Sequence, residues 1–318
     1  MSLLQVKNLV MYYKTQRGWV QAVDNVSFDV NQEDSFGLAG ESGCGKTSCA
    51  LALLKLLPSN AKIVKGSILF EGDDITKMSE KDVRRRIRWK KISMVFQGAM
   101  NALHPTYSVG SQIAEAILLH EDATKEDAMG RAGKLLELVG LEPDKTNRYP
   151  HELSGGMKQR VVTAMALACN PAIVIADEPT TALDVIIQAQ VLGVMKELRR
   201  KLKVAWILIT HDLSLITETC NKLAIMYAGK IVETGDIAAL YKEPLHPYTQ
   251  KLLSAFPSID GPIRELSSIP GSPPDLLHPP VGCRFHPRCT HVMDICKKEI
   301  PLLQKSGGRL VACHLYSR

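Results

Sequence analysis

The segment Gly-Glu-Ser-Gly-Cys-Gly-Lys-Thr at positions 40–47 constrains the fold more than any other part of the chain. Its pattern, a glycine, four further residues and then Gly-Lys-Ser/Thr, is typical of a loop that cradles phosphate groups. The apolar run 35–39 before it predicts a strand, and the run 48–54 after it predicts the start of a helix. The sequence therefore predicts an α/β fold with an anion site at this strand-to-helix turn.

Each residue type in this loop suits the binding of a nucleotide's phosphates. Glycines let successive backbone N–H groups turn inward around an anion, and the N-terminus of the following helix adds a partial positive charge. Lys46 can reach the terminal phosphates, and the Thr47 hydroxyl can hold Mg²⁺.

Three further apolar runs, each expected to be a buried strand, deliver polar side chains at their carboxyl ends. These side chains are Gln97 after the run 92–96, Asp177 and Glu178 after 172–176, and His211 after 204–210. Ligands bind at this edge of open α/β sheets. We expect Asp177 to reach Mg²⁺ directly or through water, and Glu178 to polarise a water molecule. A lone histidine is usually structural, but His211 beside a phosphate site is expected to face the γ-phosphate.

The motif Leu-Ser-Gly-Gly at 153–156 precedes an apolar helix predicted over 161–168. Ser154 is a good N-cap for that helix. Gly155 and Gly156 lower the helix propensity of the first turn. That cost is understandable if their backbone N–H groups approach an anion closely. A plain serine-capped helix remains the alternative.

The chain divides by composition into a core and a C-terminal extension. Residues 108–150 have the apolar spacing of helices, which predicts a mostly helical insertion, about 98–170, within an α/β domain at 1–256. Seven prolines between positions 257 and 282 preclude regular helix or sheet, so we expect a semi-rigid connector. The remainder of 257–318 is too small to build a hydrophobic core of its own.

Composition limits where the chain can work. It has 45% hydrophobic and 23% charged residues, as globular proteins do, and no apolar run long enough to span a membrane. The N-terminus lacks the apolar segment of a signal peptide, so we expect a cytoplasmic protein.

The basic run 84–91 is interpreted as a solvated helix face, because the net charge of +6 is otherwise dispersed. We therefore expect no nucleic-acid partner.

Four of the eight cysteines gather near the C-terminus, separated by five, six and sixteen residues. In a cytosolic chain such a group favours metal binding over disulfides. Four thiolates satisfy a 4Fe–4S cluster, whereas zinc ligand pairs are typically only two to four residues apart. The spacing favours iron–sulfur and leaves zinc open, with His286, His291 and His314 as possible substitute ligands. The four cysteines are Cys283, Cys289, Cys296 and Cys313.

The ordered set of motifs resembles the nucleotide-binding subunits of ABC transporters over about residues 3–255. The set consists of the P-loop at 40–47, Gln97, the Leu-Ser-Gly-Gly motif, Asp177-Glu178, the Ala-Leu-Asp at 182–184 and His211. The sequence His-Pro-Tyr at 246–248 and the cysteine tail look like those of dipeptide and oligopeptide importer ATPases, with nickel importers as close relatives. The spacing of the cysteines resembles the iron–sulfur tail of some dipeptide-importer ATPases.

The resemblance implies an ABC-type fold, ATP and Mg²⁺ as ligands, and ATP hydrolysis. It implies that Tyr13 stacks on adenine, with Tyr12 as the second choice, and that Thr47 and Gln97 contact Mg²⁺ with Asp177 nearby. Glu178 would activate the attacking water. The residues implied to wrap the phosphates are Ser42, Gly43, Cys44, Gly45, Lys46, Thr47 and Ser48.

The resemblance also implies an assembly. Ser154 and Gly156, with Gly155 between them, would act on ATP held by an opposing subunit, and Asp184 would lie at that interface. The partners would be two transmembrane permease subunits, a second ATPase subunit that is a paralogue, and indirectly an extracellular or periplasmic peptide-binding protein. The location would be the cytoplasmic face of the membrane.

Two alternatives remain open. One is the ATPase of a nickel importer. The other is a soluble ABC ATPase that acts on ribosomes or DNA, although such proteins usually have two cassettes or a long coiled-coil insertion. Two departures from the family pattern, Cys44 in place of serine and Met157 in place of glutamine, remove no catalytic residue.

Overall fold

A computed structural model describes residues 2–181, 183–254 and 269–317. The chain forms two compact units, one made of Met1–Val30, Ser35–Thr76 and Ile209–Arg318, the other of Asn31–Asp34 and Lys77–Leu208. The first part of the predicted connector, residues 257–268, and Ala182 of the Ala-Leu-Asp motif lie outside the described residues.

The first unit contains a β-sheet formed by the N-terminal strands, in the order β2-β1-β4-β5. Strand β1 pairs antiparallel with β4, so that Val6 lies opposite Ile68. Apolar side chains such as Leu4 and Val23 are fully buried here. These strands are β1 (Ser2–Thr15), β2 (Gly18–Asn31), β4 (Ala61–Phe70) and β5 (Asp73–Asp74).

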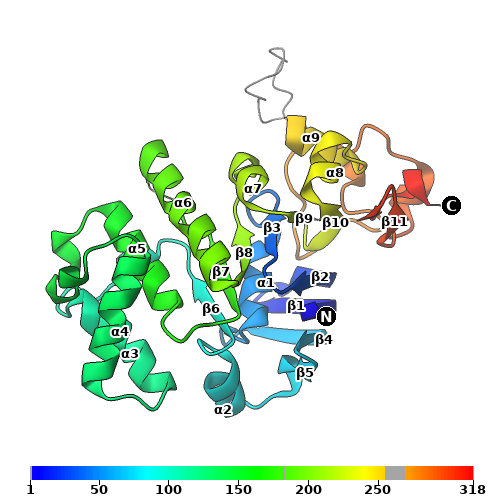
Figure 1. The fold of residues 1–318 in the computed structure, drawn as a ribbon. Coiled ribbons are helices and arrows are strands. Elements are labelled where there is room, and N and C mark those ends of the chain that lie inside the picture. Colours follow the sequence, from blue (N-terminus) through cyan, green and yellow to red (C-terminus); the bar gives the residue numbers. More distant parts are fainter. Residues whose placement is uncertain (1, 182, 255–268, 318) are drawn as a thin grey trace. The chain divides into compact units, whose positions relative to one another are not determined.

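A second group of strands in this unit follows the order β11-β12-β10-β9-β3. Strand β3 is buried along its whole length and runs parallel to β9, as a continuous apolar strand should. The strands are β3 (Ser35–Ala39), β9 (Lys222–Tyr227), β10 (Lys230–Asp236), β11 (Gln304–Ser306) and β12 (Arg309–Val311). The helices of the unit are α1 (Lys46–Leu53), α7 (Leu213–Thr219), α8 (Ile237–Lys242) and α9 (Pro247–Ser254) (Figure 1).

The second unit combines strands in the order β8-β7-β6 with a group of helices. Strands β6 and β7 are parallel, with Met94 opposite Ile175. Helices α3, α4 and α5, drawn in green in Figure 1, pack against one another. The elements are α2 (Glu80–Asp82), β6 (Ile92–Val95), α3 (Val109–His120), α4 (Lys125–Leu138), α5 (Gly155–Ala166), β7 (Ile173–Asp177), α6 (Val185–Leu202) and β8 (Ala205–Ile209).

Local chemistry explains where these helices begin. Ser108 caps α3 by accepting a hydrogen bond from the Ser111 N–H, and Thr124 caps α4 in the same way from Asp127. After α4, Gly140 adopts a φ of +75°, which glycine tolerates best. Helices α3, α4 and α5 are thus three capped helices that pack against one another.

The C-terminal segment packs against the core of the first unit. Strand β12 pairs antiparallel with β10, so that Val311 lies opposite Glu233. Phe285 is buried against the rings of Tyr227 and Tyr248, with centroids 5.1 and 5.4 Å away. These contacts join the segment to the rest of the first unit, and its strand pairing was not predicted from the sequence.

Candidate functional site

The P-loop, residues 40–47, lies between β3 and α1 in the first unit. Gly40 and Gly45 have φ values of +149° and +106°. A Cβ at Gly40 would lie 2.1 Å from the Met226 carbonyl oxygen, and one at Gly45 would lie 2.1 Å from that of Ala22. These two glycines are therefore required by close packing against neighbouring strands as well as by the conformation of an anion-binding loop.

Lys46 is buried and its ammonium lies over the loop. Its Nζ donates hydrogen bonds to the carbonyl oxygens of Gly40 and Glu41, at 2.7 and 3.0 Å. The next residue, Thr47, is exposed at the first turn of α1. The exposed loop residues Ser42 and Gly43 lie on the same stretch. The arrangement offers a cation, a hydroxyl and a helix N-terminus to an anion at one place.

Of the two adjacent tyrosines, Tyr13 contacts the P-loop helix. Its hydroxyl lies 3.1 Å from Ser48 Oγ. Tyr12 instead interacts electrostatically with Asp24 and Arg284; burial and then Asp24 raise the pKa of its hydroxyl. Tyr13 therefore lies beside the P-loop helix, and its contact with adenine stays a prediction.

Cys44 has the surroundings of an unreactive thiol. It is a buried residue of the loop, and burial raises the pKa of its thiol, although Lys46 opposes that shift. Because the thiolate is the reactive form, this cysteine is expected to be inert in the folded protein.

In the second unit, the end of β7 forms a polar cluster. Asp177 is 1% exposed. Glu178 has a φ of +47°, in the left-handed region that a non-glycine residue adopts at a cost. The Gln97 amide donates to Glu178 Oε2 at 2.8 Å, and the Thr181 hydroxyl donates to the same oxygen at 3.0 Å. The structure thus brings together Gln97 and Glu178, which are far apart in sequence.

The predicted residues at helix starts are N-caps in the structure. Ser154 accepts a hydrogen bond from the Met157 N–H at the start of α5, and Asp184 accepts one from Ile187 at the start of α6. A Cβ at Gly156 would lie 2.5 Å from Ile187 Cγ2. Helix packing therefore gives a second reason for this glycine, besides the anion contact proposed from the sequence. Gly155 is exposed and carries no such constraint.

His211 is exposed just beyond β8, in the same unit as the P-loop. Asp212 follows it and caps α7 by accepting a hydrogen bond from the Ser214 N–H at 2.9 Å. The histidine is thus held between a buried strand and a capped helix.

Comparison with known proteins decides the family. A model of the ABC transporter family matches residues 23–181, and one described as the oligopeptide/dipeptide transporter C-terminal region matches residues 232–296. The oligopeptide transport ATP-binding protein OppD of Bacillus subtilis is 47% identical, over 97% of this chain and 87% of the relative. The chain belongs to the ATP-binding subunits of ABC transporters, in the oligopeptide/dipeptide family.

Other relatives agree. The dipeptide transport ATP-binding protein DppD of Escherichia coli is 44% identical over 99% of this chain and 97% of the relative. Among solved structures, the dimeric ATP-binding cassette MJ0796 bound to ADP and Pi has a TM-score of 0.65 at 26% identity, over 74% of this chain and 98% of that one. The predicted fold is therefore confirmed, and ATP binding and hydrolysis are the activity of this ABC subunit. Among the described residues, none of the helices has the length and apolar character that crossing a bilayer requires.

The four C-terminal cysteines of this ABC subunit lie near one another in the first unit. The Cys283 N–H donates to the Cys296 carbonyl oxygen at 2.8 Å. Burial raises the pKa of Cys283 and of Cys313 to about 11, and the charges of the other cysteines of the group add to the shift. Within residues 2–181, 183–254 and 269–317, no three histidine, cysteine or acidic side chains are placed to hold a single metal ion. Metal binding is thus not established by the structure.

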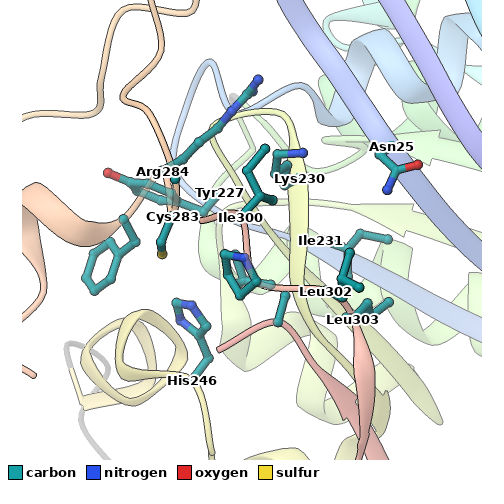
Figure 2. Close-up of a pocket in the computed structure, with 15 residues that line it drawn as sticks. Asn25, Tyr227, Lys230, Ile231, His246, Cys283, Arg284, Ile300, Leu302 and Leu303 are labelled. Atoms are coloured by element: carbon teal, nitrogen blue, oxygen red, sulfur yellow. The ribbon is translucent and has the colours of Figure 1, made fainter. Parts of the chain in front are cut away.

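A cavity of about 60 Å³ lies beside Cys283. Figure 2 shows the side chains of His246, Cys283 and Leu302 around it. His246 is fully buried, which lowers its pKa to about 3, and its Nδ1 accepts a hydrogen bond from the Tyr248 N–H. The space is too small for a nucleotide and is separate from the P-loop residues.

Two buried arginines beside the cysteines were missed by sequence reasoning. Arg284 donates to Gln21, Asp24 and the Ala228 carbonyl oxygen. Arg288 forms a two-pronged ion pair with Glu41 of the P-loop. The signal available in the sequence was only their position, directly after Cys283 and directly before Cys289.

Proposed function

We propose that this chain is the ATP-hydrolysing subunit of an importer of dipeptides or oligopeptides. The observation that carries the proposal is its likeness to peptide transport ATP-binding proteins over nearly the whole chain, including the C-terminal region at 232–296. The ATP chemistry is assigned to residues 1–256, with a helical subdomain at about 98–170. Residues 257–318 add a connector and a cysteine module.

The proposed nucleotide contacts in the first unit begin with the P-loop. Its backbone N–H groups and Lys46 hold the phosphates, and Tyr13 stacks on the adenine. The contact between Tyr13 and Ser48 supports this, because it places an aromatic ring beside the loop. His211 contacts the γ-phosphate. The full loop set is Ser42, Gly43, Cys44, Gly45, Lys46, Thr47 and Ser48.

The proposed catalytic base is Glu178, which takes a proton from the attacking water. Its hydrogen bond with Gln97 fixes one carboxylate oxygen and leaves the group oriented. The donor set of Thr47, Gln97 and Asp177 consists of oxygen atoms, which suits Mg²⁺. When bound there, the ion would neutralise charge on the phosphates. Positioning and charge neutralisation supply most of the catalysis in phosphoryl transfer.

The proposed active form contains two ATPase subunits. Ser154, Gly155 and Gly156 contact the ATP of the opposing subunit, and Asp184 lies at the interface. Val185 and Ile186, which follow Asp184, have 80% and 72% of their surface exposed. Exposed apolar side chains of this kind favour a partner surface. ATP binding then closes the pair and hydrolysis opens it, a two-state device suited to driving a transporter.

The other proposed partners are two transmembrane permease subunits, with the second ATPase a paralogue and a peptide-binding protein outside the membrane. Leu119 and Tyr107, at the two ends of the α3 region, are 63% and 58% exposed and offer apolar contacts for a permease. The proposed location is therefore peripheral, on the cytoplasmic face of the membrane.

Uptake by the assembled transporter tests the substrate. The chain, its permeases and its partner ATPase would be reconstituted in vesicles, and uptake of a labelled dipeptide, a pentapeptide and Ni²⁺ would be measured with and without ATP. ATP-dependent peptide uptake supports the proposal. Uptake of Ni²⁺ alone would replace it with a nickel importer.

Glu178→Gln tests the assigned base. We expect ATP hydrolysis to fall about 10²–10⁴-fold, as for loss of a general base, while ATP binding is retained. Glu197→Gln is the matched control, because Glu197 is an exposed residue of α6 paired with Lys201. Hydrolysis at the wild-type rate in Glu178→Gln would show that another residue is the base.

We further propose that Cys283, Cys289, Cys296 and Cys313 bind a 4Fe–4S cluster. A single tetrahedral zinc needs four sulfurs at about 2.3 Å from one point, which brings the thiolates closer together than a four-iron core does. The four thiols lie near enough to affect one another electrostatically, and they supply the ligand count that such a cluster requires. The Cys289 sulfur also accepts a hydrogen bond from the His291 N–H at 3.4 Å, as cluster ligands do.

Metal analysis of protein purified without oxygen tests the cluster. We expect a brown protein with about four irons and four sulfides per chain, and loss of both in Cys296→Ser. Cys220→Ser, a buried cysteine distant in sequence, is the control. A colourless protein with one zinc would make the site a structural zinc centre and leave the assignment of the ATPase unchanged.

A further inference from the structure

The first residue after Gly40 in the P-loop is a carboxylate, Glu41. An uncompensated negative charge within a loop that binds polyphosphate would repel its ligand. The structure places a compensating charge there from the far end of the chain: Arg288, within the cysteine segment. The two residues are 247 positions apart in sequence.

The pair has the geometry of a strong, specific contact. Arg288 Nη1 lies 2.7 Å from Glu41 Oε2, and Nη2 lies 3.0 Å from Oε1. The arginine side chain is 5% exposed and that of the glutamate 26%. A two-pronged guanidinium–carboxylate pair fixes orientation as well as charge, and lysine cannot reproduce it.

The remaining donors of Arg288 anchor it to its surroundings. Nε donates to the Pro270 carbonyl oxygen at 2.7 Å, and Nη1 also reaches the Tyr227 hydroxyl at 3.3 Å. An arginine side chain keeps its proton in folded proteins, so the Arg288 guanidinium is a fixed cation.

Glu41 in turn contacts Lys46, the residue proposed to bind phosphate. Its carbonyl oxygen accepts a hydrogen bond from Lys46 Nζ at 3.0 Å, and its N–H donates to the Tyr248 hydroxyl at 3.0 Å. The side chain, the N–H and the carbonyl of one loop residue are thus held by Arg288, Tyr248 and Lys46 respectively.

We propose that Arg288 is a positioning residue of the ATP site: it neutralises Glu41 and holds the P-loop in its phosphate-binding shape. The cysteine segment is thereby a working part of the nucleotide site. This inference rests on the proposed role of residues 40–47 in binding phosphate.

Equilibrium binding of a fluorescent ATP analogue to the full chain tests the proposal. We expect Arg288→Ala to weaken binding about tenfold, a coupling typical of linked sites. In a Glu41→Gln background the same substitution should weaken binding less than about twofold, because no carboxylate is left unpaired. A purely structural role for Arg288 would give equal losses in both backgrounds and would overturn the proposal.

Arg284→Ala is the matched control. Arg284 is equally buried and docks the same segment, but its partners are Asp24, Gln21 and Ala228 rather than the P-loop. We expect its variant to bind the analogue as wild type does within about twofold, below the range typical of coupled sites. If Arg284→Ala lost as much affinity for the analogue as Arg288→Ala, docking of the segment alone would explain the effect, and the inference would be refuted.

Two further variants keep the result decisive. Arg288→Lys retains the buried charge but cannot form the two-pronged pair, so it should show an intermediate loss of binding. This variant covers the case in which Arg288→Ala fails to fold. Lys46→Ala separates the inference from its premise. If Lys46→Ala binds normally, the phosphate-binding role of the loop fails; if it binds poorly while Arg288→Ala and Arg288→Lys bind normally, only the inference fails.

Discussion

The P-loop and the cysteine-bearing segment, residues 283–313, are both largely irregular stretches of the first unit, yet they differ in how much of their shape nearby residues determine. In the P-loop, Lys46 bonds to carbonyl oxygens five and six positions before it, although Arg288 and Tyr248 also hold Glu41 from a distance. The cysteine segment is shaped by distant residues, through Phe285 against Tyr227 and through β12 against β10. A loop with a local pattern of this kind can be recognised from a short motif, whereas a segment docked by distant contacts cannot.

The largest expected effect is the loss of ATP hydrolysis when the lysine of the P-loop is removed. Lys46→Ala should lower ATP hydrolysis about a thousandfold, because a preorganised charge near the phosphates is lost. It should change the free energy of unfolding by only about 1–2 kcal/mol, since it removes two hydrogen bonds. Steady-state ATPase assays and urea unfolding measure the two quantities.

Lys65→Ala, an exposed residue of β4, is the control for both assays. If Lys46→Ala strongly lowered the free energy of unfolding but left ATP hydrolysis near normal, Lys46 would serve stability rather than function, contrary to this prediction.

The second effect concerns stability in the cysteine segment. Phe285→Ala should lower the free energy of unfolding by about 3–5 kcal/mol, because a ring that is 1% exposed leaves a cavity between Tyr227 and Tyr248. Urea unfolding followed by circular dichroism measures it.

Val281→Ala provides the comparison, since Val281, just before the segment, is 73% exposed and should change stability by less than about 0.5 kcal/mol. Equal, small effects of the two substitutions would mean that the segment is not docked through Phe285.

The smallest effect separates two glycines within the P-loop. Gly43 has a φ of +76°, but a Cβ added there would meet no atom within 4 Å, so Gly43→Ala should cost about 1–2 kcal/mol from backbone strain alone. Gly45→Ala should cost more, because its Cβ would meet the Ala22 carbonyl oxygen. Thermal unfolding of both variants measures the difference; equal costs would show that the loop moves away from β2 without penalty.

The sequence predicted strands and helix caps well where the signal was local. The strand predicted at 35–39 is β3, and Ser154 caps its helix as expected. The strand-end positions of Gln97 and Glu178 were also predicted, because parallel strands deliver their ends to one edge. Their hydrogen bond then follows from the fold.

Long-range contacts were not predictable in the same way. Nothing in the spacing of residues near Cys289 indicates that Arg288 meets Glu41, because the contact depends on how the chain returns after hundreds of residues. The helices α8 and α9 were missed because they are short, and strand β12 because three residues give no periodicity. The roles of individual side chains toward ATP remain predictions.

The pairing of β12 with β10 has a practical consequence for solubility. Without residues beyond 254, β10 would present a row of unpaired N–H and C=O groups along its outer edge, a template for joining other chains. In the intact chain that edge is covered by β12 and then by β11, a strand of only three residues that carries Lys305. Short strands with lysine resist edge-to-edge association. A chain cut at residue 254 should therefore aggregate more readily than one that keeps β11 and β12 over this edge.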